Sequence, residues 1–182
     1  MSKVQRYFLE IEVKDNKNIN FELPPKIRIL KEEKRDFNIN KFFYKKIGDD
    51  HFWRDRLVWS DERWKKYVSN KNLETWIIKN DNEFIGFYEK EFHPSKNETE
   101  LINMGILKKF RGKKLGSILL QHAIKNSLHL KSDRMWVHTC SLDHKFALNN
   151  YKSKGFKIFI LLFFFRTYSY PFDGNPIELP SD

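Results

Sequence analysis

The chain has 182 residues, of which 40% are hydrophobic and 16% aromatic, which suits one folded domain and excludes a disordered protein. The formal net charge of +10 attracts polyanions, but the lysines alternate with acids and asparagines, as is typical of a solvated surface. The single cysteine, Cys140, excludes an intramolecular disulfide.

The first part of the chain predicts two short strands and a helix. Residues 7–13 partly alternate between apolar and polar side chains, which predicts a strand. Residues 26–30 follow a pair of prolines and predict a second, shorter strand. Apolar residues recur at roughly helical spacing over 37–47, and we expect Gly48 to close this helix.

A second helix and three strands follow. Ser60 precedes two acidic residues, which predicts an N-cap and a helix that continues to about Ser69. Residues 73–79 and 83–92 flank Asn-Asp-Asn and predict a hairpin. After a His-Pro-Ser turn, residues 98–107 predict the third strand of a meander.

The last part predicts helices that alternate with strands. Residues 115–130 form an amphipathic helical pattern, and 134–140 predict a strand. A helix is expected over 143–154, ended by Gly155, before a last long strand over 156–165. This order predicts a mixed sheet covered by helices.

The apolar run over 158–165 is the longest in the chain and is far too short to span a membrane. The N-terminus carries charges within its apolar stretch and has no small-residue cleavage site, so we expect no signal peptide. We therefore expect a cytoplasmic protein without a membrane or nucleic-acid partner. A homodimer is left open.

The turn over 108–114, Lys-Lys-Phe-Arg-Gly-Lys-Lys, leads directly into the helix over 115–130. Unpaired amides and the positive end of the helix dipole make such a helix start suited to a pyrophosphate. A turn of this composition is also common without any ligand, so the composition alone leaves both interpretations open.

Two motifs resemble those of one enzyme family. Arg111, Lys114 and Gly116 resemble motif A of the GNAT acetyltransferases, Arg/Gln-x-x-Gly-x-Gly/Ala, with Lys114 in place of the first glycine. Residues 147–156 resemble motif B, Ala-x-x-x-Tyr-x-x-x-Gly-Phe, and 136–144 resemble a bacterial subgroup with Trp-Val-His-Thr-Cys-x-Leu-Asp-His. On both motifs together, the chain is identified as a member of the GNAT superfamily of N-acetyltransferases.

The resemblance implies an α/β (α+β) fold, the GNAT acyl-CoA N-acyltransferase fold. This fold has a mixed, mostly antiparallel sheet of six to seven strands flanked by about four helices. We expect one domain over 1–182, with an N-terminal strand extension over 1–25 and a C-terminal tail over 168–182. The implied function is N-acetylation with acetyl-CoA (coenzyme A) as cofactor, by direct attack of a primary amine, which we expect on an unidentified small molecule.

By the same resemblance, the backbone at the end of the strand over 98–107 holds pantetheine, and the following turn holds the pyrophosphate. The candidate cofactor-binding residues are Met104, Gly105, Ile106, Leu107, Arg111, Gly112, Lys113, Lys114, Leu115, Gly116, Ser117, His144 and Asn149.

Three residues are catalytic candidates. Tyr151 resembles the family's general acid, and its alternative role is core packing. Glu100 is placed like the base of some GNAT enzymes, with a solvated carboxylate as the alternative, and His138 is a further candidate base or a structural histidine. Trp53 and Arg56 are candidate acceptor-binding residues, because an aromatic wall and an arginine suit a carboxylate-bearing acceptor. Their alternative role is to pack the connection between two helices.

Two other functions compete with the enzyme. Lys114 and His144 depart from the motifs and leave open a catalytically silent acyl-CoA-binding module. The basic composition leaves open a nucleic-acid-binding module. No metal is expected, since His138, Cys140, Asp143 and His144 match no standard zinc spacing. We expect Asp143 to cap the following helix.

Overall fold

The computed structural model describes residues 2–16, 19–130 and 132–166. The strands are β1 (Ser2–Glu12), β2 (Ile27–Lys31), β3 (Leu73–Asn80), β4 (Glu83–His93), β5 (Glu98–Ile106), β6 (Arg134–Cys140) and β7 (Lys157–Arg166). The α-helices are α1 (Phe37–Gly48), α2 (Asp61–Ser69), α3 (Leu115–His129) and α4 (Ala147–Ser153). Three short 3-10 helices are η1 (Lys14–Asn16), η2 (Asp49–His51) and η3 (Lys108–Phe110).

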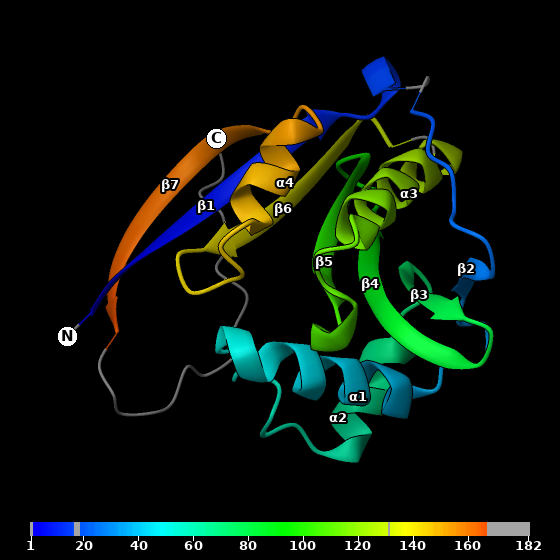
Figure 1. Ribbon diagram of the computed structural model, residues 1–182. Helices are drawn as coiled ribbons and strands as arrows, with labels where there is room; N and C mark the ends of the chain where they lie inside the picture. Colours follow the sequence, from blue (N-terminus) through cyan, green and yellow to red (C-terminus); the bar gives the residue numbers. More distant parts are fainter. Residues whose placement is uncertain (1, 17–18, 131, 167–182) are drawn as a thin grey trace.

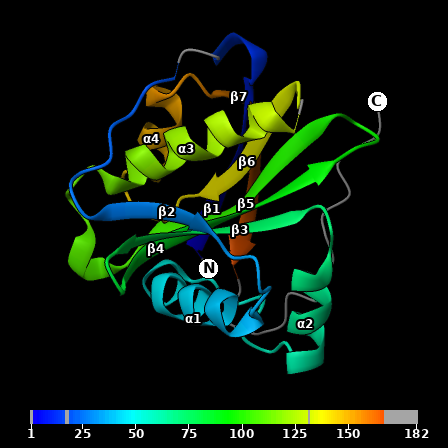
Figure 2. The ribbon, with the colours of Figure 1, turned by 90° about the vertical axis from the view of Figure 1, so that its right-hand side faces the viewer.

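The seven strands form one sheet in the order β2-β3-β4-β5-β6-β1-β7. Neighbouring strands are antiparallel except β5 and β6, which are parallel. Helices α1 and α2 cover one face of the sheet, and α3 and α4 cover the other (Figure 1, Figure 2). The expected class, a mixed and mostly antiparallel sheet flanked by about four helices, is confirmed.

The first helix ends at Gly48 as predicted, but the expected reason for a glycine at this position is wrong. Gly48 is the last residue of α1 and keeps a helical φ of −69°, and the chain continues into η2. The left-handed residue is Phe52, with a φ of 58°. A side chain at Gly48 would bring its Cβ to 2.4 Å from Cβ of Trp53. Glycine is therefore required here by the close approach of Trp53 and not by the end of a helix.

The last helix begins later than predicted. The prediction placed its start at Asp143, but α4 begins at Ala147, and its N-cap residue Phe146 makes no side-chain capping bond. The carboxylate of Asp143 accepts hydrogen bonds from Oγ1 of Thr139 at 2.6 Å and from the Cys140 amide at 3.0 Å. Asp143 thus fixes the end of β6, and the prediction that it caps the helix is wrong.

The N-terminal strand is an inner strand of the sheet. The strand within the expected N-terminal strand extension over 1–25 is β1, which lies between β6 and β7 and pairs with both. The tail expected over 168–182 lies outside the described residues.

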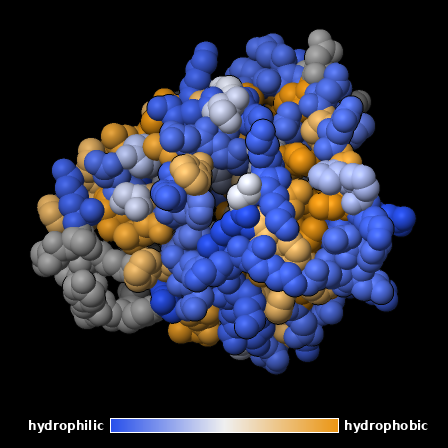
Figure 3. Space-filling view, in the orientation of Figure 1, coloured by the Kyte–Doolittle hydropathy of each residue, from blue (hydrophilic) through white to orange (hydrophobic). Residues whose placement is uncertain are grey.

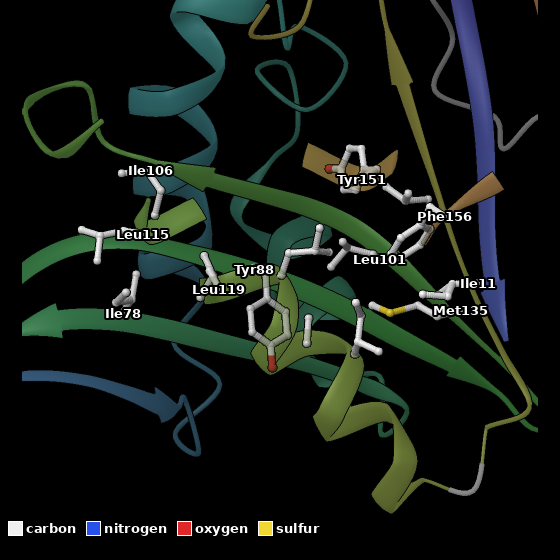
Figure 4. Packing of buried hydrophobic residues seen from close by; sticks show 14 of the residues in the cluster. Ile11, Ile78, Tyr88, Leu101, Ile106, Leu115, Leu119, Met135, Tyr151 and Phe156 are labelled. Carbon is white, nitrogen blue, oxygen red and sulfur yellow. The ribbon is translucent and has the colours of Figure 1, made fainter. Parts of the chain in front are cut away.

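The two faces of the sheet have separate cores. The face under α3 packs buried residues from five strands and two α-helices, β1, β3, β4, β5, β6, α3 and α4, and Figure 4 shows Leu115 and Leu119 of α3 beside Ile78 and Ile106. The face under α1 has a smaller aromatic core, in which the rings of Phe43 and Phe87 stack with centroids 4.8 Å apart.

Strand β7 is the last in the sheet order and carries apolar side chains that are exposed among the described residues. These side chains are Ile158, Leu161, Leu162, Phe163 and Phe165. Figure 3 shows hydrophobic residues (orange) on the left of the view, the side on which Figure 1 shows β7. Within the ranges that the structure describes, no helix is long and apolar enough to span a membrane.

The turn before α3 takes backbone conformations that favour glycine. Gly112 has a φ of 80°, and Lys114, the N-cap residue of α3, has a φ of 60°. A side chain in this left-handed region costs about 1–2 kcal/mol, because its Cβ crowds the following carbonyl. The lysine therefore keeps the conformation that a glycine would adopt, at a cost in stability.

Replacing Lys114 with glycine should remove this strain. Lys113→Gly is the matched control, since Lys113 has no positive φ, and both changes loosen the unfolded chain equally. We expect the free energy of unfolding of Lys114→Gly to exceed that of Lys113→Gly by about 1 kcal/mol, measured by equilibrium urea denaturation. Equal stabilities would contradict a strained backbone at Lys114.

His122 of α3 is a half-buried histidine whose surroundings disfavour protonation. Nδ1 of His122 lies 2.9 Å from the Tyr88 hydroxyl, and its ring packs against Trp76 with centroids 4.9 Å apart. Burial, together with the charges of Lys90 and Lys125, lowers the pKa of His122 to about 4.

The low pKa of His122 makes the stability of the fold depend on pH. An unfolded histidine binds a proton below about pH 6.5, whereas folded His122 does so only near pH 4. The free energy of unfolding should therefore fall as the pH drops from about 6.5 to 4, by up to about 3 kcal/mol. In urea denaturation, His122→Gln should lose less stability than the wild type over this pH range, because the contribution of His122 is gone, while His129→Gln at the exposed end of α3 should lose as much as the wild type. The same pH dependence in His122→Gln and the wild type would refute this.

Candidate active site

Strands β5 and β6 run side by side for only four residue pairs, from Glu98 opposite Arg134 to Leu101 opposite Val137. Ile102 then has no counterpart on β4, because Leu101 pairs with Lys90 and the next pair is Asn103 with Glu89. Such an extra residue bends its strand and increases the local twist. Figure 1 shows β5 and β6 diverging beyond this point.

A cavity of about 840 Å³ opens where the two strands diverge. One end is lined by the turn that leads into α3 and by the start of α4. The other end is lined by the connection between α1 and α2, by the middle of β1 and β6, and by β7. We call these the cofactor end and the acceptor end.

Most of the predicted site residues line this cavity. They are Met104, Gly105, Ile106, Arg111, Gly112, Lys114, Leu115, Gly116, Ser117, His144, Tyr151, His138, Trp53 and Arg56. Four predicted residues do not line it, namely Leu107, Lys113, Asn149 and Glu100. Asn149 is exposed on α4, and its neighbour Asn150 lines the cavity instead and donates to the Gly116 carbonyl at 3.4 Å.

The cofactor end presents unpaired backbone amides. The amides of residues 112–116 donate to no other described residue, whereas those of Ser117 and Ile118 both donate to the Lys114 carbonyl. An added Cβ at Gly112 would meet nothing within 4 Å, and at Gly116 only Ile106 at 3.7 Å, so the absent side chains leave open space. Amides at a helix start with this access suit a phosphate.

Arg111 anchors the turn and still has one donor free. Its Nε donates to the Ile106 carbonyl at 3.0 Å, and its Nη1 pairs with Asp50 at 2.8 Å. This hydrogen bond is the main reason that the pKa of Asp50 is lowered. Nη2 of Arg111 is buried and has no acceptor among the described residues.

Two histidines lie beside this arginine. The rings of His51 and His144 meet edge to face with centroids 5.7 Å apart. Burial, followed by the positive charge of Arg111, lowers the pKa of both, so both are neutral at pH 7.

Tyr151 reaches the cavity from α4. The side chain is buried, its ring packs on Phe156, and its hydroxyl has no hydrogen-bond partner among the described residues. Burial, with a smaller contribution from the Asp143 carboxylate, raises the pKa of Tyr151 well above 10. The hydroxyl therefore keeps its proton at all physiological pH values.

His138 is exposed where it faces the cavity, and its ring packs on Phe8 with centroids 5.7 Å apart, among neighbouring protein groups. This burial, followed by the charge of Arg6, lowers the pKa of His138, so the ring is neutral at pH 7. Glu100 lies one strand away on β5 and hydrogen-bonds His93 at 3.4 Å. Glu100 also acts electrostatically on His138, so the two candidate bases lie near each other.

Trp53 connects the two sides of the diverging sheet. Its Nε1 donates to Oδ1 of Asp143 at 3.2 Å, while Oδ2 of Asp143 binds the end of β6. Trp53 also packs on Tyr44 of α1 with ring centroids 5.6 Å apart. The connection between α1 and α2 is thereby fixed against β6 across the cavity.

Arg56 belongs to a buried network around Glu89, which is 1% exposed. The Glu89 carboxylate accepts from Asn40 and Asn103 at 2.6 Å, from the Tyr67 hydroxyl at 2.9 Å and from Arg56 at 3.2 Å. Burial by itself lowers the pKa of Arg56, but Tyr67 and Glu89 raise it above its usual value, so Arg56 stays charged. Arg56 thus lines the cavity with its charge already compensated.

Sequence reasoning missed several residues of the site. Glu89 and Asn103 support Arg56, Asp143 holds Trp53, and Arg6 lines the acceptor end. The one available signal was the charged run Glu89-Lys90-Glu91 directly after the apolar residues 84–88 of the same strand, since buried charges require partners.

The residues present fit acetyl-CoA. The free amides of residues 112–116 and the buried Nη2 of Arg111 suit a pyrophosphate, and the gap beside 102–106 suits an extended pantetheine. No group of three or more metal-ligating side chains occurs within the described ranges.

The fold resembles that of several solved structures. A functionally unknown conserved protein from Staphylococcus epidermidis ATCC 12228 has a TM-score of 0.60 at 12% identity, over 89% of this chain and 60% of that one. An aminoglycoside acetyltransferase, meta-AAC0020, from an uncultured soil metagenomic sample has a TM-score of 0.62 at 12% identity, over 74% and 90%. A GCN5-related N-acetyltransferase from Kribbella flavida has 0.59 at 13%, over 85% and 54%. The chain thus spans less than two thirds of the first and third of these proteins.

A sequence search among curated proteins finds no match. The model of the Acetyltransferase (GNAT) family matches residues 31–156, which include the diverging strands, the turn before α3, and helix α4. The chain therefore belongs to the GNAT family of acetyltransferases, enzymes that use acetyl-CoA as their acetyl donor.

Proposed function

We propose that the protein transfers an acetyl group from acetyl-CoA directly to a primary amine of a small molecule. The observation that carries this proposal is one continuous cavity that joins the free amides of 112–116 to Tyr151 and His138. When bound, acetyl-CoA supplies an activated acetyl thioester. The cavity then needs donors for the diphosphate, a base for the amine and an acid for the leaving sulfur.

At the cofactor end, residues of this chain bind and orient acetyl-CoA. The amides of 112–116 and Nη2 of Arg111 hold the diphosphate, and the free edge of β5 over 102–106 holds the pantetheine arm. Asn150 keeps α4 against the start of α3 through the Gly116 carbonyl, so the walls of this end stay together.

Proton transfer is divided between two groups with opposite pKa shifts. His138 is neutral at pH 7, so its ring can accept the proton of the attacking amine, directly or together with Glu100. Tyr151 is protonated, so its hydroxyl holds the proton that the leaving sulfur requires. Burial causes both shifts, since it disfavours the charged form of each group.

The shape of the acceptor end supports a small acceptor. Trp53 and Tyr44 form an aromatic wall, and Phe164 of β7 faces the same space. The contact of Trp53 with Asp143 crosses the cavity at this end. A pocket with these walls suits a small molecule better than a protein chain.

The structure removes one reason for considering a catalytically silent module. Lys114 replaces the first glycine of motif A, yet it holds the left-handed φ of 60° that the turn requires. The neighbouring amides remain free, so the substitution does not close the turn.

Replacing Gly116 with valine should weaken coenzyme A binding, because the added side chain occupies the space that a phosphate needs. We expect the Kd from isothermal titration calorimetry to rise about 10-fold or more, equivalent to the loss of one or two charge-assisted hydrogen bonds. Lys125→Val, on the exposed side of α3, is the control for placing a β-branched residue in this helix. If Gly116→Val bound coenzyme A as tightly as this control, the cofactor would lie elsewhere.

Replacing Tyr151 with phenylalanine should slow transfer while preserving the fold, because the hydroxyl makes no hydrogen bond among the described residues. With acetyl-CoA and a panel of small primary amines, we expect kcat to fall about 100-fold, with the Kd for coenzyme A unchanged. An unchanged kcat would exclude Tyr151 as the acid. Absence of turnover by the wild type on every amine, despite tight coenzyme A binding, would overturn the proposed function.

A further inference from the structure

Three arginines line the acceptor end of the cavity, and they differ in how their charge is compensated. Arg56 pairs with the buried carboxylate of Glu89 at 3.2 Å, and Arg54 pairs with Asp49 at 3.8 Å. Arg6 forms no ion pair, and its side chain donates no hydrogen bond, to any residue that the structure describes. Arg6 is therefore the cation of this end with unused binding capacity.

The guanidinium of Arg6 is held in place without a polar partner. Its carbon lies 5.1 Å from the ring centroid of Phe164, within range of a cation–π contact. Its Nε is buried and has no acceptor among the described residues. The Nη atoms of the same guanidinium also donate to no described residue, and because Arg6 lines the cavity they are open to an oxyanion there.

Arg6 is also close to the group proposed to deprotonate the amine. It pairs with Cys140 across β1 and β6, and Phe8, two residues along the same face, pairs with His138. The charge of Arg6 acts directly on His138. Asp55, from the connection between α1 and α2, lines the same end and forms no ion pair with any described residue. The acceptor end thus offers two charged groups that form no ion pair with any described residue, the guanidinium of Arg6 and the carboxylate of Asp55.

We propose that Arg6 binds a carboxylate of the acceptor, so that the substrates are amines that also carry a carboxylate, as amino acids do. This inference rests on the proposed function and specifies its substrate class. The guanidinium fork matches a carboxylate with two parallel hydrogen bonds. It assigns to Arg6 the role that the sequence suggested for Arg56, whose charge Glu89 already compensates.

The test compares amino acids of two to six carbons with their carboxamides, which keep the amine and remove the negative charge. For each pair we would measure kcat/KM with acetyl-CoA and, by calorimetry, the Kd in the presence of coenzyme A. The wild type should prefer the carboxylate about 10- to 100-fold. Arg6→Gln should lose this preference, with a larger rise in KM for the acids than for the carboxamides, and Arg6→Lys should keep part of it. Lys3→Gln, which removes a charge from the same strand outside the cavity, should keep all of it.

The outcomes separate this inference from the proposed function. Equal kcat/KM for acids and carboxamides, or a preference that survives Arg6→Gln, would overturn the role of Arg6 while leaving acetyl transfer intact. Binding that favours the carboxylate and depends on Arg6, without any turnover, would keep the role of Arg6 and overturn the enzymatic proposal. Binding of neither compound would overturn the role of Arg6.

Discussion

The early separation of β5 from β6 is the constraint on which the rest of the site depends. The two parallel strands share only four residue pairs, and the extra residue Ile102 bends β5 away. A continued pairing would satisfy the backbone of 102–106 internally and fill the space where the cavity lies. Because the strands part, the edge of β5 over 102–106 that faces away from β4 has no partner in β6, and the turn into α3 opens toward the gap. Helix α4 places Tyr151 on the cavity wall.

A sheet that divides in this way needs other contacts to hold its halves together, and polar groups provide several of them. Asp143 binds Trp53 on one side and the end of β6 on the other. On the far side of the gap, Glu89 joins α1, α2 and β5 through Asn40, Tyr67 and Asn103. Removing one partner of such a buried carboxylate is costly, so these contacts fix the walls of the cavity more firmly than apolar packing alone.

Periodicity predicted the elements well because local spacing determines them, but the exceptions have specific causes. The predicted start of the last helix at Asp143 is four residues early, because aspartate is a common N-cap residue. The carboxylate of Asp143 binds the end of β6 instead. Glycine is common at helix ends, but at position 48 it is the close approach of Trp53 that excludes a side chain. In both cases a contact between residues of different elements decided the role of a residue that local rules interpreted otherwise.

The sequence by itself determined the family, the order of elements and most of the residues that line the cavity around the turn before α3, because those residues follow each other in the chain. Only the tertiary structure decided the acceptor end. There β1 lies between β6 and β7 and brings Arg6 beside His138 and Phe164, from three distant parts of the chain. Whether an arginine is available to a ligand depends on such neighbours. Arg56, the arginine that the sequence suggested for the acceptor, is paired with Glu89, whereas Arg6 has no such partner among the described residues.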